Sequence, residues 1–368
     1  MKIGVPKEIK NHEYRVGLTP PSVAELVAAG HEVLVETNAG AGIDFGDQDY
    51  VAVGATILPD AKSVFAAAEM IVKVKEPQPG EIAMLEPRHL LFTYLHLAAD
   101  KPQAEGLMKS GATCIAYETV TAPRGGLPLL KPMSEVAGRM SVQVGAHYLE
   151  KEQGGRGVLL GGVPGVAPAK VAILGGGVSG VNAAQMAVGM RADVTIYDIS
   201  NDRLAELDMF FSSQIKTAYA SKAAIAAAVR NAHLVIGAVL VPGAAAPKLV
   251  TREMIGTMKR GAVMVDIAID QGGCFETSHA TTHQDPVFEV DGVIHYCVAN
   301  MPGAVARTST FALNNATLPF ALALANHGAE AAMRADRHLA AGLNVMGGKI
   351  AYKAVADDLA LEYQAWNG

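Results

Sequence analysis

The chain has 368 residues, half of them apolar and 18% charged, which excludes a disordered chain and gives enough apolar material for two buried cores. Its 30 lysines and arginines against 36 aspartates and glutamates leave a net charge of −6 without a basic run, which excludes a typical nucleic-acid-binding surface. Three widely spaced cysteines give neither a disulfide framework nor a CxxC metal pattern, so we expect a reducing, cytoplasmic compartment.

No membrane-directed segment is expected. Residues 1–8 lack an apolar run after Lys2, so they do not resemble a secretory signal. The most apolar stretch, residues 232–247, is shorter than the ~18–20 residues that span a bilayer, and it contains Pro242. The sequence therefore predicts a soluble protein with neither a membrane nor a nucleic-acid partner.

The first 128 residues alternate between strand-like and helix-like segments. Thr19 is placed to cap a helix that starts with Pro20 and Pro21 and ends at Gly30. Strands are expected at residues 2–5, 32–36, 70–74, 90–94 and 113–116. This rhythm predicts a mainly parallel sheet with helices on its faces.

A break in composition follows at residues 122–132, which contain three prolines and two glycines and suggest a domain boundary. Ser134 is then expected to cap a helix that runs towards Glu150. A second α/β series is predicted, with a helix over residues 178–190 and strands at residues 171–174, 194–197, 234–237, 263–267 and 294–298.

Beyond Asn300 the pattern becomes helical. Residues 307–330 are predicted to be helical with a break near Pro319, and the rest up to Trp366 to be mostly helical. Because this segment is too short to form a domain, we expect it to return to the N-terminal one. The predicted class is α/β with two domains, residues 1–128 with 307–368 and residues 129–306.

The strongest motif is GxGxxG, formed by Gly175, Gly177 and Gly180 directly after a predicted strand and at the start of a helix. Such glycines allow a tight turn, close approach of a pyrophosphate, and close packing of helix on strand. Asp198 follows 18 residues after Gly180, near the ~20 expected for an acid that binds the ribose hydroxyls. Such an acid repels a 2′-phosphate, so the motif favours NAD over NADP; the alternative is a plain turn and a solvated Asp198.

Four polar residues are candidates for substrate chemistry. Arg15 is suited to binding a carboxylate, although it could instead pair with Glu13 or Glu8. Lys75 and His96 follow predicted strands, and ligands of open α/β sheets bind beyond the carboxyl ends of strands. Asp270 also follows a strand, although an Asp before two glycines is common in turns.

Several long segments together resemble the family of alanine dehydrogenases and of the NAD-binding subunits of nicotinamide nucleotide transhydrogenases. They are the N-terminal GVPKE at residues 4–8 with Asn11, Glu13, Arg15 and Thr19-Pro20, then PMSEVAGR at 132–139, VDIAIDQGGCFE at 265–276 and ANMPG at 299–303. The resemblance extends over essentially the whole chain. It implies two Rossmann-like domains with parallel sheets, the substrate domain being discontinuous and completed by the C-terminal helices.

The resemblance also implies an activity, the reversible conversion of L-alanine, NAD and water to pyruvate, ammonium and NADH. It implies a homohexamer as the assembly. Arg15 would hold the substrate carboxylate, and Lys75 would bind and polarise the oxo or imino group. His96 would act as the acid–base group, and Asp270 would support water and ammonia chemistry at the same carbon. The cofactor contacts implied in this way are Ser134, Val178, Ser179, Asp198, Arg203, Val239, Leu240, Ile267, Asp270, Asn300 and Met301, beside the motif glycines.

The sequence departs from the family pattern at three positions. Ala323 stands where many relatives have a Glu four residues before the histidine matching His327, so no metal is predicted there. Ala220 replaces a common Ser near the adenosine end of the cofactor, and His279 replaces an Arg of some relatives.

Three other functions compete with this interpretation. The first is the NAD-binding subunit of a transhydrogenase, the second a saccharopine dehydrogenase, and the third an NAD(H)-sensing protein without turnover. The four polar residues Arg15, Lys75, His96 and Asp270 are all present, which favours a catalytic amino-acid dehydrogenase.

Overall fold

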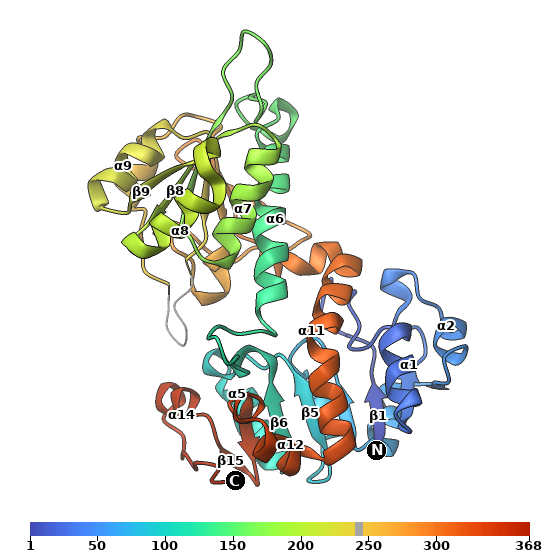
Figure 1. The fold of residues 1–368 in the computed structure, drawn as a ribbon. Helices are drawn as coiled ribbons and strands as arrows, with labels where there is room; N and C mark the ends of the chain where they lie inside the picture. The colour runs from blue at the N-terminus through green and yellow to red at the C-terminus, as the bar shows by residue number, and fades with distance from the viewer. Residues whose placement is uncertain (240–245) are drawn as a thin grey trace. The chain divides into compact units, whose positions relative to one another are not determined.

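The computed structural model describes residues 1–239 and 246–368, which form two compact units (Figure 1). One unit comprises residues 1–133 together with 305–368, and the other comprises residues 134–304. Each unit is a sheet of mostly parallel strands with helices packed on it, so the predicted α/β class is confirmed, as is the return of the C-terminal segment to the first unit.

The first unit is built on an eight-stranded sheet of order β15-β14-β6-β5-β4-β1-β2-β3. Its strands are β1 (Lys2–Val5), β2 (Glu32–Glu36), β3 (Thr56–Leu58), β4 (Met70–Val72), β5 (Leu90–Thr93), β6 (Thr113–Ala116), β14 (Leu343–Met346) and β15 (Lys349–Ile350). Its helices are α1 (Pro20–Ala28), α2 (Asp47–Val51), α3 (Ala61–Ala67), α4 (Pro79–Ile82), α5 (Lys101–Ser110), α11 (Ala306–His327), α12 (Ala329–Ala335), α13 (Arg337–Ala340) and α14 (Lys353–Leu359).

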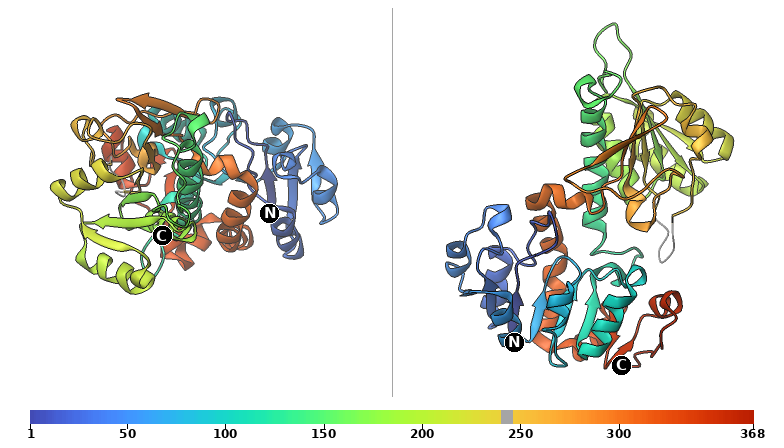
Figure 2. Two further views of the ribbon diagram at one scale, coloured as in Figure 1. Left: turned by 90° about the horizontal axis from the view of Figure 1, so that it is seen from above. Right: turned by 180° about the vertical axis from the view of Figure 1, so that it is seen from behind.

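A continuous apolar core lies between this sheet and the helices α3, α5 and α14. It joins Phe65 of α3 and Leu107 of α5 to Leu91 and Val345 of the sheet, all at most 1% exposed. Helix α11 packs elsewhere on the same unit, beside α1 (Figure 2). Asn314 of α11 ties these parts together, because its side chain accepts the N–H of Thr19 and donates to the carbonyl of Gly17.

The second unit contains a seven-stranded sheet of order β12-β13-β11-β10-β7-β8-β9. Its strands are β7 (Lys170–Leu174), β8 (Asp193–Asp198), β9 (Lys216–Tyr219), β10 (Leu234–Gly237), β11 (Val263–Asp266), β12 (Val287–Val290) and β13 (Val293–Tyr296). Its helices are α6 (Lys131–Tyr148), which starts in the first unit, α7 (Val178–Gly189), α8 (Asn201–Phe211), α9 (Lys222–Asn231) and α10 (Arg252–Ile255). Only β12, at the edge, runs antiparallel among the described strands of this sheet.

Two helix predictions were wrong. Helix α6 begins at Lys131, so Ser134 lies inside its first turn and does not cap it. Pro132 explains the earlier start, because proline fits the first turn of a helix, where its missing N–H is not needed. Helix α11 runs unbroken through Pro319, since its buried residues, from Ser309 to Leu324, hold it against the unit.

The C-terminal segment is less helical than predicted. Strands β14 and β15 add an antiparallel pair to the first sheet, and β14 pairs with β6. The two-residue turn between them is Gly347-Gly348, with φ of +57° and +77°. A glycine pair between short apolar runs is a hairpin signal, so this element was recognisable in the sequence.

Candidate active site

Four polar side chains of the first unit lie beyond the carboxyl ends of neighbouring parallel strands. Glu8 follows β1, Lys75 follows β4, His96 follows β5 and Glu118 follows β6. Because β1, β4, β5 and β6 are adjacent and parallel, these four residues lie along one edge of the sheet. The topology thus brings the two predicted residues Lys75 and His96 together. It adds Glu118, which sequence reasoning missed, and Glu8, which it considered only as a partner of Arg15.

Lys75 is held at this edge by its own backbone. The Lys75 N–H donates to Oε1 of Glu8, and the N–H of Val74 donates to the same oxygen at the shorter distance of 2.6 Å. The Lys75 carbonyl accepts a hydrogen bond from the Thr93 hydroxyl. The Lys75 side chain is only 12% exposed, and its Nζ lies 3.9 Å from the Glu76 carboxylate. The lysine is therefore a largely desolvated cation on a fixed backbone.

His96 occupies a strained position. Its φ is +51°, in the left-handed region that non-glycine residues rarely adopt. The Glu118 carboxylate accepts the N–H of His96 at 2.6 Å and that of Leu95 at 3.1 Å, and so holds this turn. The ring stacks on Tyr94 with 5.7 Å between centroids, and Nδ1 lies 3.8 Å from Glu76. The imidazole is 42% exposed.

Arg15 is buried and forms a two-pronged ion pair with Glu13. Its Nε and Nη2 donate to the two Glu13 oxygens at 2.7 and 2.6 Å, and Nη1 lies 3.2 Å from the Met133 sulfur. This is the pairing that the sequence left as the alternative role of Arg15. A substrate carboxylate would therefore share the guanidinium with Glu13, which fixes the orientation of the arginine.

The glycine-rich loop of the second unit has the geometry of a nucleotide-binding turn. Gly175 has φ of +103°, and a Cβ at Gly180 would lie 1.9 Å from the Gly175 carbonyl oxygen. A Cβ at Gly177, the N-cap of α7, would meet no heavy atom of the described residues within 4 Å. The first and third glycines are thus required by the chain itself, whereas the second borders open space at a helix N-terminus.

Asp198 stands at the end of β8, next to this loop. Its carboxylate accepts the N–H of Gly176 at 2.7 Å and that of Ser200 at 2.9 Å. Arg203 donates from Nε to the Gly176 carbonyl and pairs with Glu206. The loop, the acid and the arginine that sequence reasoning singled out are therefore in mutual contact.

Asp270 is exposed on a short 3-10 helix, residues 267–271, that follows β11. The preceding Asp266 is fully buried and holds this loop: it accepts the N–H groups of Ala268 and Cys274 and the Ser278 hydroxyl at 2.5 Å. Burial raises the pKa of Asp266, although these donors oppose the rise. Asp266 was missed by sequence reasoning, although an Asp that ends a buried strand was a visible signal.

The other predicted nucleotide contacts differ in their placement. Asn300 lies near Asp270, with 3.4 Å between its N and the Asp270 Oδ1. Six of the predicted contacts follow strands of the second sheet at its carboxyl edge: Val178, Ser179, Val239, Ile267, Asn300 and Met301. Ser134 lies on α6, and Leu240 lies outside the described residues.

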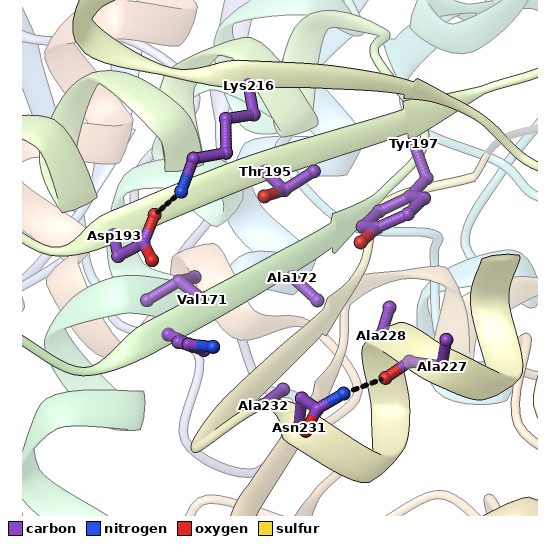
Figure 3. Close-up of a pocket in the computed structure, with 11 residues that line it drawn as sticks. Val171, Ala172, Asp193, Thr195, Tyr197, Lys216, Ala227, Ala228, Asn231 and Ala232 are labelled. Carbon is purple, nitrogen blue, oxygen red and sulfur yellow. Dashed lines mark hydrogen bonds and ion pairs between the residues drawn. The ribbon is translucent and has the colours of Figure 1, made fainter.

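A cavity of about 240 Å³ lies on the second unit and contains none of the predicted residues (Figure 3). It is lined by residues of β7, β8 and β9 and by the end of α9. Its polar groups bind one another: Lys216 pairs with Asp193 at 2.5 Å, and the Asn231 side chain donates to the Ala227 carbonyl. We therefore assign no site to this cavity.

Fold and site together define a two-unit α/β protein with a dinucleotide-binding loop in one unit and a cluster of charged residues in the other. The family model for the alanine dehydrogenase/PNT N-terminal domain matches residues 4–137, and that for the C-terminal domain matches residues 141–353. The chain belongs to the alanine dehydrogenase/PNT family, as the sequence resemblance predicted. It is accordingly an oxidoreductase that uses a nicotinamide cofactor.

Individual relatives narrow the class of oxidoreductase further. The chain is 61% identical to the alanine dehydrogenase of Halomonas elongata over 99% of this chain and 98% of that protein. A solved L-alanine dehydrogenase structure matches with a TM-score of 0.95 and 56% identity over 98% of this chain and 99% of its own. A transhydrogenase structure from Sinorhizobium meliloti is more distant, with a TM-score of 0.82 and 25% identity over 96% of this chain and 100% of its own.

None of the described helices is both long and apolar enough to cross a membrane.

Proposed function

We propose that this protein catalyses the reversible, NAD-dependent oxidative deamination of L-alanine to pyruvate and ammonium. The observation that carries the proposal is the near full-length similarity to alanine dehydrogenases, in a chain that holds Arg15, Lys75, His96 and Asp270. A transhydrogenase subunit is disfavoured because the similarity to that class is much lower. In this assignment residues 1–128 with 307–368 form the substrate domain and residues 129–306 the NAD-binding domain.

The glycine loop fits a dinucleotide. The pyrophosphate would bind at the N-terminus of α7, where unpaired N–H groups favour an anion and the open space at Gly177 leaves room for one. Asp198 would accept the ribose hydroxyls and repel a 2′-phosphate, which supports NAD over NADP. The further contacts would come from Gly175, Gly180 and the residues named above, among them Ser134, Arg203, Asn300 and Met301.

The chain's own residues would divide the chemistry as follows. Bound NAD would supply the hydride acceptor for oxidation at the alanine Cα, and NADH would supply the hydride for the reverse reaction. Arg15 holds the carboxylate, and Lys75 stabilises the negative charge that develops on the pyruvate carbonyl oxygen when ammonia adds to that carbonyl. His96 takes and gives the protons of water addition and ammonia departure, and Asp270 orients the water or ammonia.

The assembly and compartment belong to the same proposal. A homohexamer and a cytoplasmic location are inferred from the family resemblance. The three cysteines Cys114, Cys274 and Cys297, all buried and unpaired, are in keeping with a reducing compartment.

The direct test uses L-alanine that carries deuterium at Cα. With NAD, the protein should produce pyruvate, ammonium and NADH in equal amounts, with the deuterium on the nicotinamide C4 position of NADH. Deuterium released to solvent, or NADH formed without ammonium, would contradict hydride transfer from an amino acid.

Replacing Asp198 with asparagine should weaken NAD binding about 10-fold and reduce the preference for NAD over NADP, because the charge that accepts the ribose hydroxyls and repels a 2′-phosphate is lost. Asparagine keeps an oxygen for the Gly176 N–H, so the loop should stay folded. Dissociation constants for NADH and NADPH measure the effect. The exposed Asp208 of α8, replaced in the same way, is the control, and an unchanged preference in the Asp198 variant would refute its role.

Two alanine substitutions in the glycine loop should act differently. Gly177→Ala should leave the unfolding temperature unchanged and weaken NADH binding at least about 10-fold, since the methyl group occupies open space beside the proposed pyrophosphate site. Gly180→Ala should lower the unfolding temperature of the free protein, because its Cβ would collide with the Gly175 carbonyl. Calorimetry and NADH titration separate the two effects; equal binding by Gly177→Ala and the wild type would exclude a pyrophosphate at that position.

A further inference from the structure

The Glu76 carboxylate contacts both proposed catalytic groups of the first unit, Lys75 and His96, and has no role in the mechanism above. Glu76 directly follows Lys75, and its side chain is 14% exposed. Its Oε2 lies 3.9 Å from Lys75 Nζ and 3.8 Å from His96 Nδ1, while its Oε1 pairs with Lys10. Three groups that are cationic or can become so therefore surround one carboxylate.

The two oxygens of this carboxylate are not equivalent. Oε1 has a hydrogen bond from Lys10, whereas Oε2 is buried and has no hydrogen-bond partner among the described residues. A buried carboxylate oxygen without a donor is costly and needs compensation from nearby positive charge. Here Lys75 and His96 lie just beyond hydrogen-bond distance and are the groups that supply it.

The electrostatics agree with this geometry. Burial alone would raise the pKa of the Glu76 carboxyl, yet His96, Lys75 and Lys10 hold that pKa well below its usual range. Glu76 is thus an anion at neutral pH. The other acids nearby are engaged differently: Glu8 accepts the backbone N–H groups of residues 74 and 75, and Glu118 accepts those of residues 95 and 96.

We propose that Glu76 is a positioning residue, a shared counter-ion that holds the Lys75 ammonium and the His96 ring in place. This inference rests on the proposed function, in which Lys75 polarises the substrate and His96 transfers protons. It predicts that the negative charge of Glu76, and not only its bulk, sets the pH range in which both directions of the reaction run.

The test compares Glu76→Gln, which removes the charge at constant shape, with Glu76→Asp, which keeps the charge. The profiles of kcat/KM against pH are measured with pyruvate and ammonium, and with alanine. Pyruvate reduction needs a protonated acid, and alanine oxidation needs a free base. Loss of the Glu76 negative charge should therefore move the pH-dependent limb of each kcat/KM profile to lower pH by about one unit. Glu76→Gln should also lose at least about tenfold in kcat/KM for pyruvate at neutral pH, while Glu76→Asp keeps the wild-type limbs.

The control is Glu86→Gln, an equal loss of charge at an exposed acid of the same unit that pairs with Arg88. Its profiles should match those of the wild type. NADH binding, which involves the other unit, should be the same in all variants and reports that each is folded. If Glu76→Gln has wild-type limbs, or if Glu76→Asp shifts them as much as Glu76→Gln does, the proposal is wrong while the activity of the wild type stands. An inactive wild type would instead refute the proposed function itself.

Discussion

Replacing His96 with asparagine is expected to lower kcat by about 10²- to 10⁴-fold in both directions while leaving NADH binding unchanged. Asparagine cannot take up a proton near neutral pH, but it tolerates the left-handed backbone that His96 adopts at φ +51°. Its N–H can still donate to Glu118, so the turn should keep its shape. The loss then reports acid–base chemistry rather than a damaged fold.

The alanine variant at the same position separates these causes. His96→Ala loses the imidazole and also places a residue that disfavours φ above zero at that turn, so it should be less stable than His96→Asn at a similar residual activity. Steady-state kinetics with a thermal unfolding scan measure both. A kcat within threefold of the wild type in His96→Asn would remove His96 from the mechanism.

Replacing Lys73 with methionine is expected to reduce the free energy of unfolding by about 3–5 kcal/mol. Lys73 is fully buried and lies between Glu8, at 3.2 Å, and Glu81, at 2.7 Å, which are also buried. Burial on its own lowers the pKa of Lys73, but the two carboxylates more than reverse this, so the lysine is charged. Its removal leaves two buried acids without a counter-ion, at the strand end that carries Lys75.

Two comparisons make this prediction specific. The triple variant Lys73→Met, Glu8→Gln, Glu81→Gln should recover part of the loss, because no charge is left unpaired. Lys353→Met, which breaks an exposed pair with Asp357, should cost about 0.5 kcal/mol or less. Urea unfolding curves give all three values, and a loss below 1 kcal/mol in Lys73→Met would show that the buried ions do not depend on one another.

The nucleotide loop could be predicted because its signals are close together in the chain. Gly175, Gly177 and Gly180 span six residues, and Asp198 ends the next strand, so one βαβ unit determines their contact. Lys75 and His96 could be placed at one sheet edge for a similar reason. Parallel strands joined by helices put their carboxyl ends together whatever the details of packing.

The supporting acids could not be predicted, because each depends on a contact between distant segments. Glu8 and Lys73 are 65 residues apart, and Glu118 is 22 residues from His96. A single sequence does not say which buried acid faces which backbone N–H. Arg15 illustrates the limit: the residue types alone favour its pairing with an acid such as Glu13, and they do not tell whether it also binds a substrate carboxylate.

Helix boundaries failed for a different reason. Pro319 and Ser134 have strong local preferences, as a helix breaker and a helix cap, but both lie inside helices. In α11 the burial of one whole face outweighs the hydrogen bond that a proline removes. Local preference therefore predicts where a helix can end, and packing decides where it does end.

The most direct test of the proposed activity is the consumption of NADH in the presence of pyruvate and ammonium, with ammonium omitted or NADPH substituted in parallel. We expect rapid loss of NADH that requires ammonium and is much slower with NADPH. Loss of NADH without ammonium would identify a 2-oxo acid reductase instead. Binding of NADH without any turnover would contradict the proposed catalytic function and leave the transhydrogenase-like or NAD(H)-sensing alternatives.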